Sequence, residues 1–316
     1  MKKEFKPRQI MLSKRANIFY LDKVRIMQKD MRLVYLSQTN EEMGHYFNIP
    51  ERNTSLLLLG KGSSITDAAA RKLADSNVLV GFCGNGGTPL FSTTDPVFLP
   101  LTPHSEYGPN EYMQQWCKKW FNEPERMKMA VMLVEKRMEI AEHFWSKNKD
   151  LKILDVTFPE NLSKRFLSRS ASAITSNDIL MAEAEWAKSL YALFARSFSM
   201  SFTRDTNPSS DGSISSNVNN YITHGNYLAY GLASVVLNGL GVSYCFPLLH
   251  GKTRRGALVF DVADLIKDAI VLPCAFICAN NRKLKEREFR AILIDMLEDS
   301  GALDVLFAAV KDIAES

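Results

Sequence analysis

The sequence predicts an α+β protein with a small β-rich domain at the N-terminus and a larger all-α domain at the C-terminus. Short runs of β-branched and aromatic residues, separated by turns, fill the first hundred positions and are typical of strands. Beyond them, apolar residues recur at three- and four-residue steps, as they do on the buried face of a helix. We therefore expect domains at residues 1–100 and 101–316, divided within the proline-containing segment 92–109.

The composition indicates a globular protein. The chain has 316 residues, of which 46% are hydrophobic and 23% charged, so it is long enough for two cores and too apolar to be disordered. No apolar run approaches the roughly 18 residues of a membrane span, and the basic N-terminus lacks the apolar region of a signal peptide. The cysteines are scattered and do not form a disulfide framework. We expect a reduced, cytoplasmic protein with no membrane partner.

The expected N-terminal domain is mostly strands. They are predicted at Asn17–Leu21, Val24–Met27, Met31–Leu36, Ser55–Leu59 and Val78–Phe82. The S-x-x-D pattern at Ser64 and Asp67 predicts the start of a helix that continues to about Asp75. The glycine-rich turn Gly84–Gly87 predicts a hairpin that pairs the last strand with Thr88–Phe91.

The expected C-terminal domain is helical. A long helix is predicted from Glu125 to Ser146, and further helices near 110–121, 160–172, 178–199, 218–240, 262–279 and 284–316. The polar segment Arg204–Asn217 predicts a loop. Cys274 and Cys278 lie four apart in an apolar stretch. We expect them in a helix core rather than at a zinc site, because no second pair of ligands follows.

Glu183 is a carboxylate on the apolar face of the predicted helix 178–199. It follows Ile179 by four residues and precedes Trp186 by three, whereas Glu185 falls on the wetter side of the helix. A buried carboxylate is costly unless a metal, a cation or a proton compensates its charge. Both a core salt bridge with Arg or Lys and a role as a metal ligand fit this residue.

A second group of candidate ligands lies further along the chain. His250 is followed after eleven residues by Asp261 and then by Asp264, and Asp268 extends this acidic helix face by one turn, opposite an apolar face. A divalent cation would relieve the repulsion that Lys267 neutralises only in part. The alternative is a solvated first helix turn, which favours acids. One Glu, one His and two Asp form a mixed nitrogen and oxygen set that suits Mg²⁺ or Mn²⁺ rather than structural zinc.

Basic residues near these acids fit a polyanionic partner. Arg254 and Arg255 lie between the histidine and the acids, where cations can hold a phosphate beside a metal. Lys164 and Arg165, followed by Phe166, combine charge with an aromatic ring. An ordinary solvated face is the alternative for each. A net charge of +4 permits nucleic-acid binding without requiring it. Because P-loop and G-x-S-x-G motifs are absent, nucleotide-driven and acyl-transfer chemistry are poorly supported.

Taken together, these segments resemble a known family. A helical glutamate after I-L-M-A and before A-x-W-A-K, then L-x-H-G-x-x-R-R-G, then F-D-V-A-D-L-x-K, resemble CRISPR-associated endonuclease one, the integrase of the adaptation complex. Leu56–Val80 resembles the strand, glycine turn, helix and strand of that family's β-domain. The E-A-E-W segment and the chain length resemble the subtype I-F branch.

The resemblance implies roles for individual residues. Glu183, His250 and Asp264 match the ligands of a divalent metal, Mg²⁺ or Mn²⁺. Asp261 matches a further catalytic acid, which either supports the site from behind the ligands or binds a second ion. Lys267 matches a basic residue that contacts DNA.

The resemblance also implies a function. The family joins the 3′-hydroxyl ends of captured DNA to a repeat by phosphoryl transfer, and it cleaves double-stranded and branched DNA. The implied partners are a second copy of the chain and the small companion protein of the adaptation complex, which in this subtype is fused to the helicase-nuclease. Two alternatives stay open: a non-catalytic DNA-binding scaffold whose acids only support the helix bundle, and a repair nuclease that cleaves junctions.

Overall fold

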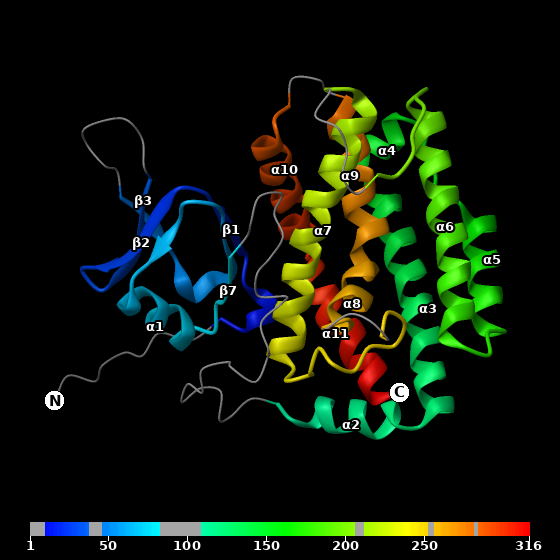
Figure 1. Ribbon diagram of the computed structural model, residues 1–316, viewed down its shortest axis with the longest axis horizontal. Coiled ribbons are helices and arrows are strands. Elements are labelled where there is room, and N and C mark those ends of the chain that lie inside the picture. Colours follow the sequence, from blue (N-terminus) through cyan, green and yellow to red (C-terminus); the bar gives the residue numbers. More distant parts are fainter. Residues whose placement is uncertain (1–9, 38–45, 83–108, 206–211, 252–255, 281–283) are drawn as a thin grey trace. The chain divides into compact units, whose positions relative to one another are not determined.

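The structure is a computed structural model that describes residues 10–37, 46–82, 109–205, 212–251, 256–280 and 284–316 (Figure 1). It divides into two compact units, Met1–Gly108 and Pro109–Ser316. The predicted α+β class, a small β-rich N-terminal part followed by a larger helical part, is confirmed. The predicted boundary between residues 100 and 101 falls outside the described residues and stays a prediction.

In the described part of the N-terminal unit, the strands form two sheets. The strands are β1 (Asn17–Leu21), β2 (Val24–Lys29), β3 (Arg32–Ser37), β4 (Tyr46–Ile49), β5 (Thr54–Leu59), β6 (Ser64–Ile65) and β7 (Leu79–Phe82). One sheet has the parallel order β1-β5-β7, and the other has the order β4-β3-β2-β6. Helix α1 (Asp67–Asp75) packs its buried face, with Ala69 and Leu73, into the core of the unit.

Each predicted strand has a counterpart, but the predicted helix start at Ser64 is wrong. Ser64 belongs to β6, which pairs with β2, and Thr66 instead caps α1 by accepting a hydrogen bond from the Ala69 N–H. The short strands β4 and β6 are not predicted, because neither is long enough to show an alternating pattern. The predicted hairpin partner Thr88–Phe91 lies outside the described residues.

The described part of the C-terminal unit consists of helices. They are α2 (Glu111–Trp120), α3 (Glu123–Lys147), α4 (Lys149–Ile153), α5 (Glu160–Ala171), α6 (Ser176–Ser197), α7 (Ile214–Gly239), α8 (Leu258–Ile266), the π-helical segment η6 (Lys267–Val271), α9 (Leu272–Asn280), α10 (Glu286–Asp299) and α11 (Ala302–Glu315). Helices α8 and α9 lie between α7 and α3, and α5 packs along α6 (Figure 1). Of the candidate ligands, Asp264 lies on the central helix α8, Glu183 lies on the flanking helix α6, and His250 lies in the segment before α8.

The predicted helix over 262–279 is confirmed, but it starts earlier, at Leu258, and contains a π-helical turn that the sequence does not predict. Here α8 is followed by the π-helical segment η6 and then by α9. The whole stretch is so deeply buried that its apolar pattern has no exposed face to mark a break. Hydrogen bonds in a π turn span five residues, which changes the direction of Asp268 relative to Asp264, and such turns are frequent at functional sites.

The structure also tests the predicted loop at Arg204–Asn217 and the predicted location of two cysteines. The predicted loop Arg204–Asn217 is wrong at its end, because α7 begins at Ile214 behind the Ser213 side chain, which accepts a hydrogen bond from the Ser216 N–H. Residues 206–211 of that loop lie outside the described residues. The buried thiols of Cys274 and Cys278 lie 3.8 Å apart on α9, which confirms their place in the helix core. Among the described helices, none has both the length and the hydropathy that a membrane crossing requires.

Gly225 on α7 leaves little room for a side chain beside the π-helical segment and α10, and a substitution there tests the packing of the central helices. A Cβ atom at this position would lie 2.5 Å from Val271 Cγ1 and 3.0 Å from Leu293 Cδ2. Alanine gains about 1 kcal/mol over glycine inside a helix, but overpacking a core costs about 1–3 kcal/mol. We expect Gly225→Ala to lower the free energy of unfolding, and to raise it when Val271→Ala has removed the clash. Urea unfolding of the four proteins in this double-mutant cycle measures both effects. Stabilisation by Gly225→Ala in both backgrounds would contradict the packing described.

Candidate metal centre

Glu183, His250 and Asp264 meet in the helical unit although they lie far apart in the sequence. Glu183 comes from α6, His250 from the segment before α8, and Asp264 from α8. One candidate ligand atom from each residue lies within 4.8 Å of the other two. His250 Nε2 lies 3.9 Å from Glu183 Oε2. This arrangement brings two carboxylates and one imidazole to a single point.

Asp261 holds the imidazole of His250 in place. It is fully buried, and its carboxylate accepts hydrogen bonds from the backbone N–H groups of Leu248, Leu249 and His250. His250 Nδ1 lies 2.6 Å from Asp261 Oδ1, so Nε2 is the ring nitrogen that faces Glu183. Carboxylates commonly orient metal-binding histidines in this way. These contacts fit a supporting role for Asp261 better than direct binding of a second ion.

The surroundings of His250 favour its protonated form when no ion is bound. Burial alone would lower its pKa, but the hydrogen bond to Asp261 and the charges of Asp264 and Glu183 outweigh burial and raise the pKa. A histidine binds a metal ion only in its neutral form, so metal binding here must displace a proton.

Arg137 on α3 is a buried cation that contacts the acids directly. Its side chain is 6% exposed, and Nη1 lies 2.6 Å from Glu183 Oε1 while Nε lies 2.8 Å from Asp268 Oδ2. Nη1 also lies 4.0 Å from Asp264 Oδ2. The salt-bridge interpretation of Glu183 is therefore confirmed, and the same carboxylate also belongs to the candidate ligand group.

Asp268 joins the π-helical segment to two other helices. The Trp186 indole N–H of α6 donates to Asp268 Oδ2, and the Trp145 indole N–H of α3 donates to its main-chain carbonyl, each at 2.8 Å. Asp261, Asp264 and Asp268 are 0%, 6% and 7% exposed, so the alternative of a solvated first turn is wrong. The predicted division of this helix into an acidic and an apolar face is also incomplete, because both faces are buried.

Lys267 is the second cation of the cluster. Its Nζ lies 2.5 Å from Asp264 Oδ1 and 4.6 Å from the centre of the Tyr230 ring. Burial alone would raise the pKa of Asp264, but Lys267 and Arg137 outweigh it and lower that pKa. Because the Lys267 ammonium already bonds to a carboxylate, its role as a DNA contact stays a prediction.

The cluster holds more buried negative charge than its cations neutralise. The cluster has two permanently charged cations and four carboxylates, so its formal charge is −2 when His250 is neutral. The cations are Arg137 and Lys267, and the carboxylates are those of Glu183, Asp261, Asp264 and Asp268. Burial raises the pKa of Glu183 even though Arg137 opposes this. A divalent cation has the charge that balances the cluster, and the mixed nitrogen and oxygen donors suit Mg²⁺ or Mn²⁺. The residues present therefore fit a divalent ion.

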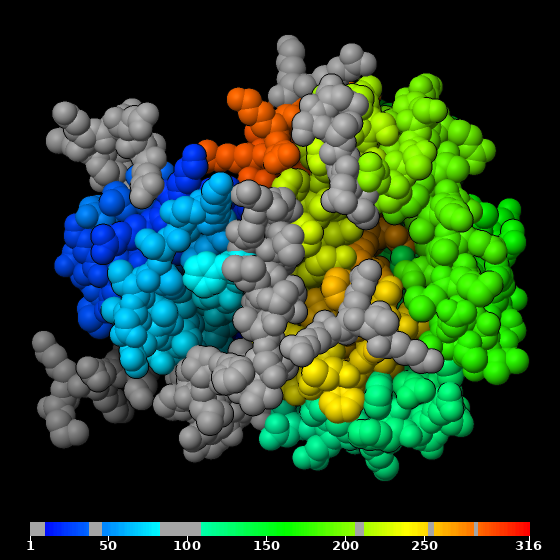
Figure 2. Space-filling model, viewed as in Figure 1, coloured from blue at the N-terminus to red at the C-terminus, as the bar shows by residue number. Residues whose placement is uncertain are grey.

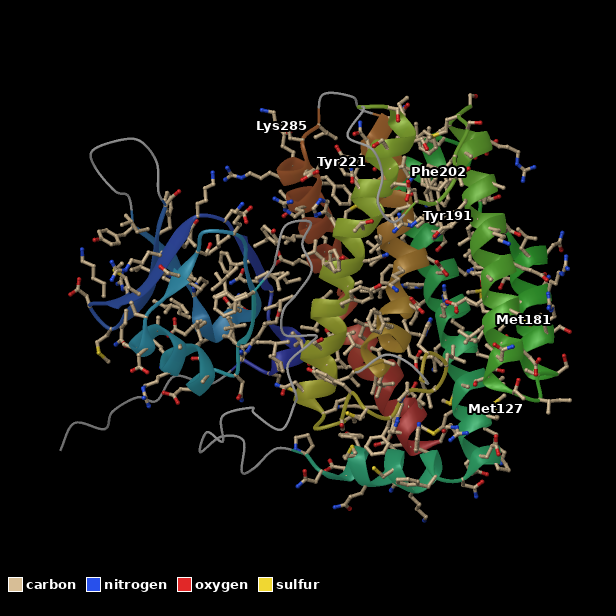
Figure 3. The ribbon with its side chains drawn as sticks, viewed as in Figure 1. Met127, Met181, Tyr191, Phe202, Tyr221 and Lys285 are labelled. Atoms are coloured by element: carbon tan, nitrogen blue, oxygen red, sulfur yellow. The ribbon has the colours of Figure 1, made fainter. Side chains whose placement is uncertain are left out.

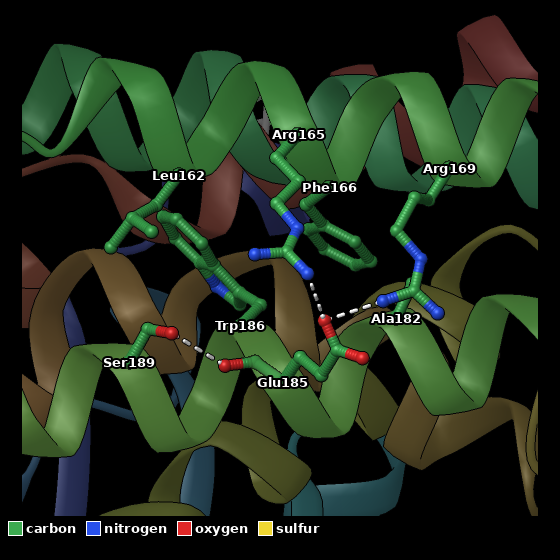
Figure 4. Close-up of a pocket in the computed structure, with 8 residues that line it drawn as sticks. All are labelled: Leu162, Arg165, Phe166, Arg169, Ala182, Glu185, Trp186 and Ser189. Atoms are coloured by element: carbon green, nitrogen blue, oxygen red, sulfur yellow. Dashed lines mark hydrogen bonds and ion pairs between the residues drawn. The ribbon is translucent and has the colours of Figure 1, made fainter.

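The predicted DNA contacts on α5 are exposed and already paired with acids. Lys164 Nζ lies 3.4 Å from Glu160 Oε2, and Arg165 Nη2 lies 3.2 Å from Glu185 Oε2. Figure 4 shows Arg165 and Arg169 converging on Glu185. In the space-filling view, α5 and α6 form part of the green outer surface of the helical unit (Figure 2). Glu185 thus lies on the wetter side of α6, as predicted, and the role of Lys164 and Arg165 stays a prediction. Arg254 and Arg255 lie outside the described residues.

Arg137 is the main participant that the sequence analysis misses. It lies three residues after Val134 and four before Ala141, on the apolar face of its helix. A charge on an apolar face is the signal that identifies Glu183, and it applies equally here. The indole contacts of Trp145 and Trp186 have no such signal, because tryptophan is expected at buried positions in any case.

The fold and the site define a class of protein: an α+β chain whose helical part buries a cluster of carboxylates and histidine suited to a divalent cation. A profile of the family described as CRISPR associated protein Cas1 matches residues 20–297. The chain therefore belongs to the Cas1 family.

Curated relatives agree over almost the whole length. The chain is 41% identical over 312 residues to the CRISPR-associated endonuclease Cas1 of Pectobacterium atrosepticum, covering 96% of this chain and 94% of the relative. It is 42% identical over 313 residues to the protein of the same name from Pseudomonas aeruginosa, covering 97% and 95%.

Solved structures share the fold. A CAS1 protein from Thermotoga maritima superposes with a TM-score of 0.70 at 13% identity, over 94% of this chain and 95% of the other. A TtCas1–DNA complex gives a TM-score of 0.66 at 18% identity, over 95% and 92%. The arrangement of a β-rich part before a helical part is thus common to these proteins.

The raised pKa of His250 predicts how metal binding depends on pH. Protonated His250 cannot bind an ion, so the affinity for Mn²⁺ should fall as the pH drops through the raised pKa, beginning above the ordinary value of about 6.5. Below that pKa the loss approaches tenfold per pH unit. Mn²⁺ titration of the metal-free protein from pH 6 to 8 measures it. Asp261→Asn removes the charge that raises the pKa and should move the transition to lower pH. An affinity that does not change over this range would contradict the role of His250.

Proposed function

We propose that this protein is a metal-dependent DNA endonuclease and integrase of CRISPR spacer acquisition. The observation that carries the proposal is the convergence of Glu183, His250 and Asp264, whose candidate ligand atoms all lie within 4.8 Å of one another. Membership of the Cas1 family and the name endonuclease borne by the curated relatives support it.

The proposed reaction is phosphoryl transfer at a phosphodiester of a DNA repeat. The 3′-hydroxyl of a captured strand attacks the phosphorus, a new P–O bond forms, and the original 3′-oxygen of the repeat leaves. With water in place of the hydroxyl, the same exchange is hydrolysis, and the DNA is cut. Bound Mg²⁺ or Mn²⁺ would polarise the phosphodiester and stabilise charge on the departing oxygen.

The protein's own residues hold this chemistry in position. Glu183, His250 and Asp264 would bind the ion, and Asp261 fixes the ring of His250 through the contact at Nδ1. Arg137 fixes the carboxylate of Glu183 from the opposite side and offsets part of the negative charge. Ordering the ligands before the ion arrives reduces the cost of binding it.

DNA and protein partners complete the proposal. Duplex and branched DNA are the proposed substrates, with Lys164, Arg165, Arg254, Arg255 and Lys267 as the proposed contacts. The protein is further proposed to act as a homodimer with the small companion protein, which in subtype I-F is fused to the helicase-nuclease. Light scattering of the purified protein tests the dimer, and co-purification with the fused companion tests the second partner.

Substitution of single ligands tests the metal-dependent chemistry. Glu183→Gln, His250→Ala and Asp264→Asn should each reduce Mn²⁺-dependent cleavage of branched and duplex DNA by at least about 100-fold, because each removes a ligand from the ion that stabilises the transition state. Glu142→Gln is the control, since Glu142 is an exposed carboxylate on α3 that belongs neither to the cluster nor to the proposed DNA contacts, and this change should leave cleavage intact.

The same assay separates the alternatives. A non-catalytic scaffold would bind DNA equally well with and without Mn²⁺ and would cut nothing, whereas full cleavage by all three ligand variants would remove the proposed site. A substrate panel with and without the companion protein distinguishes integration into a repeat from general cleavage of junctions.

The salt dependence of DNA binding tests the proposed contacts. Each phosphate that a cation neutralises contributes about 0.9 to the slope of log affinity against log salt concentration. Lys164→Ala with Arg165→Ala should therefore reduce the slope by about 1.8, and Arg254→Ala with Arg255→Ala by a similar amount. Lys118→Ala with Lys128→Ala, which removes equal charge from α2 and α3, is the control. A slope equal to that of the wild type would argue against phosphate contacts at the substituted pair.

A further inference from the structure

The candidate ligands open into a larger cavity that runs along α6 and α7. The cavity has a volume of about 190 Å³. It contains Glu183, Ala187 and Tyr191 of α6 and extends to Asn226 of α7. These α6 residues are four apart, so they share one helix face. The small side chain of Ala187 leaves the space between the other two open.

Two polar side chains of this cavity lack the protein partners that the other polar side chains have. The carboxylates, Arg137, Lys267 and His250 all bond to one another. In the part of the chain that the structure describes, neither the Tyr191 hydroxyl nor the Asn226 amide forms a hydrogen bond with the protein. Both residues are half-buried. Polar groups in such a position normally bind water or a ligand.

Tyr191 has the position and the protonation state of a hydrogen-bond donor. Its ring packs against Phe202, with ring centres 5.5 Å apart, and Figure 3 shows the two labelled side chains close together. Burial raises the pKa of Tyr191, so the phenol keeps its proton at neutral pH. Eight residues of helix place the Cα atom of Tyr191 about 12 Å along α6 from that of Glu183. Because helical side chains lean toward the N-terminus, the hydroxyl lies closer to the ligands than that.

We propose that Tyr191 and Asn226 form a subsite for the sugar–phosphate backbone of a single DNA strand, next to the phosphodiester that reacts at Glu183, His250 and Asp264. The proposal rests on the metal-dependent function proposed above, because only a bound dication makes this acidic cavity accept an anionic strand. Tyrosine and asparagine are common donors to backbone oxygens. A cavity of about 190 Å³ holds only part of one strand, so a single strand rather than a duplex is the occupant that fits.

The two residues act on the strand directly, and the expected effects follow from the loss of one hydrogen bond. Tyr191→Phe keeps the ring against Phe202 and removes only the hydroxyl. It should lower kcat/KM for DNA cleavage about tenfold, as should Asn226→Ala. Asn226→Asp is nearly the same size but adds a negative charge beside the backbone, so it should lower kcat/KM further. The loss should be the same for substrates of different base sequence.

Three measurements on the full-length protein decide the proposal: cleavage, the Kd for Mn²⁺, and binding of a DNA with a single-stranded 3′ end by fluorescence anisotropy. The variants should lose cleavage and DNA affinity but keep the wild-type Kd for Mn²⁺. Tyr112→Phe on α2, where the ring lies beside Lys311, is the control and should change neither.

Wild-type cleavage and DNA affinity in Tyr191→Phe and Asn226→Ala would overturn the subsite, as would a parallel loss of Mn²⁺ affinity or a loss confined to one base sequence. If the wild-type protein itself does not cleave DNA, the proposed function fails. In that case the fluorescence anisotropy measurement still tests the subsite, because DNA can bind without being cleaved.

Discussion

The arrangement of the helical unit depends on one constraint: the charge of several carboxylates buried between α3, α6 and α8 must be compensated. Arg137 meets part of this requirement through contacts of 2.6 Å to Glu183 and 2.8 Å to Asp268. Removing one partner from a buried ionic network leaves an uncompensated charge, which costs about 3–5 kcal/mol. The guanidinium therefore connects α3 to α6 and to the π-helical segment. The charge that remains is the reason for expecting a dication.

The backbone geometry around Asp268 is consistent with the same need to compensate buried negative charge. The π-helical segment Lys267–Val271 directs Asp268 toward Arg137 and Trp186, while Asp264, just before it, faces His250 and Lys267. Trp145 completes this arrangement by donating to the main-chain carbonyl of Asp268. Each buried polar group in this region thus has a partner, as low-dielectric surroundings require. The groups of the cavity that lack a protein partner are the exception, and their position beside the ligands is what links them to a substrate.

Sequence patterns predict the fold class and most helices and strands, and they mark Glu183, His250 and Asp264 as candidates, because a charge on an apolar face and a mixed set of donors are visible in one dimension. Their assignment as one ligand set comes from the resemblance to the family and stays a prediction. Sequence patterns are insufficient for Arg137, whose partners lie on other helices, and for the π-helical turn between α8 and α9, where burial on every side removes periodicity. The helix start at Ser64 fails for a different reason. Pairing of β6 with β2 overrides a local capping pattern, so tertiary contacts decide between two locally acceptable structures.

Side chains from three separate segments are proposed to bind one divalent ion, and anomalous diffraction from crystals soaked in Mn²⁺ would show that ion in place. Glu183, His250 and Asp264 form a single candidate ligand group. We expect one strong anomalous peak within coordination distance of these three residues, with Asp261 still bonded to His250 behind it. The absence of an anomalous peak at the cluster at saturating Mn²⁺ would contradict the proposed metal site. An ion bound elsewhere, with Glu183 still paired only with Arg137, would contradict it equally.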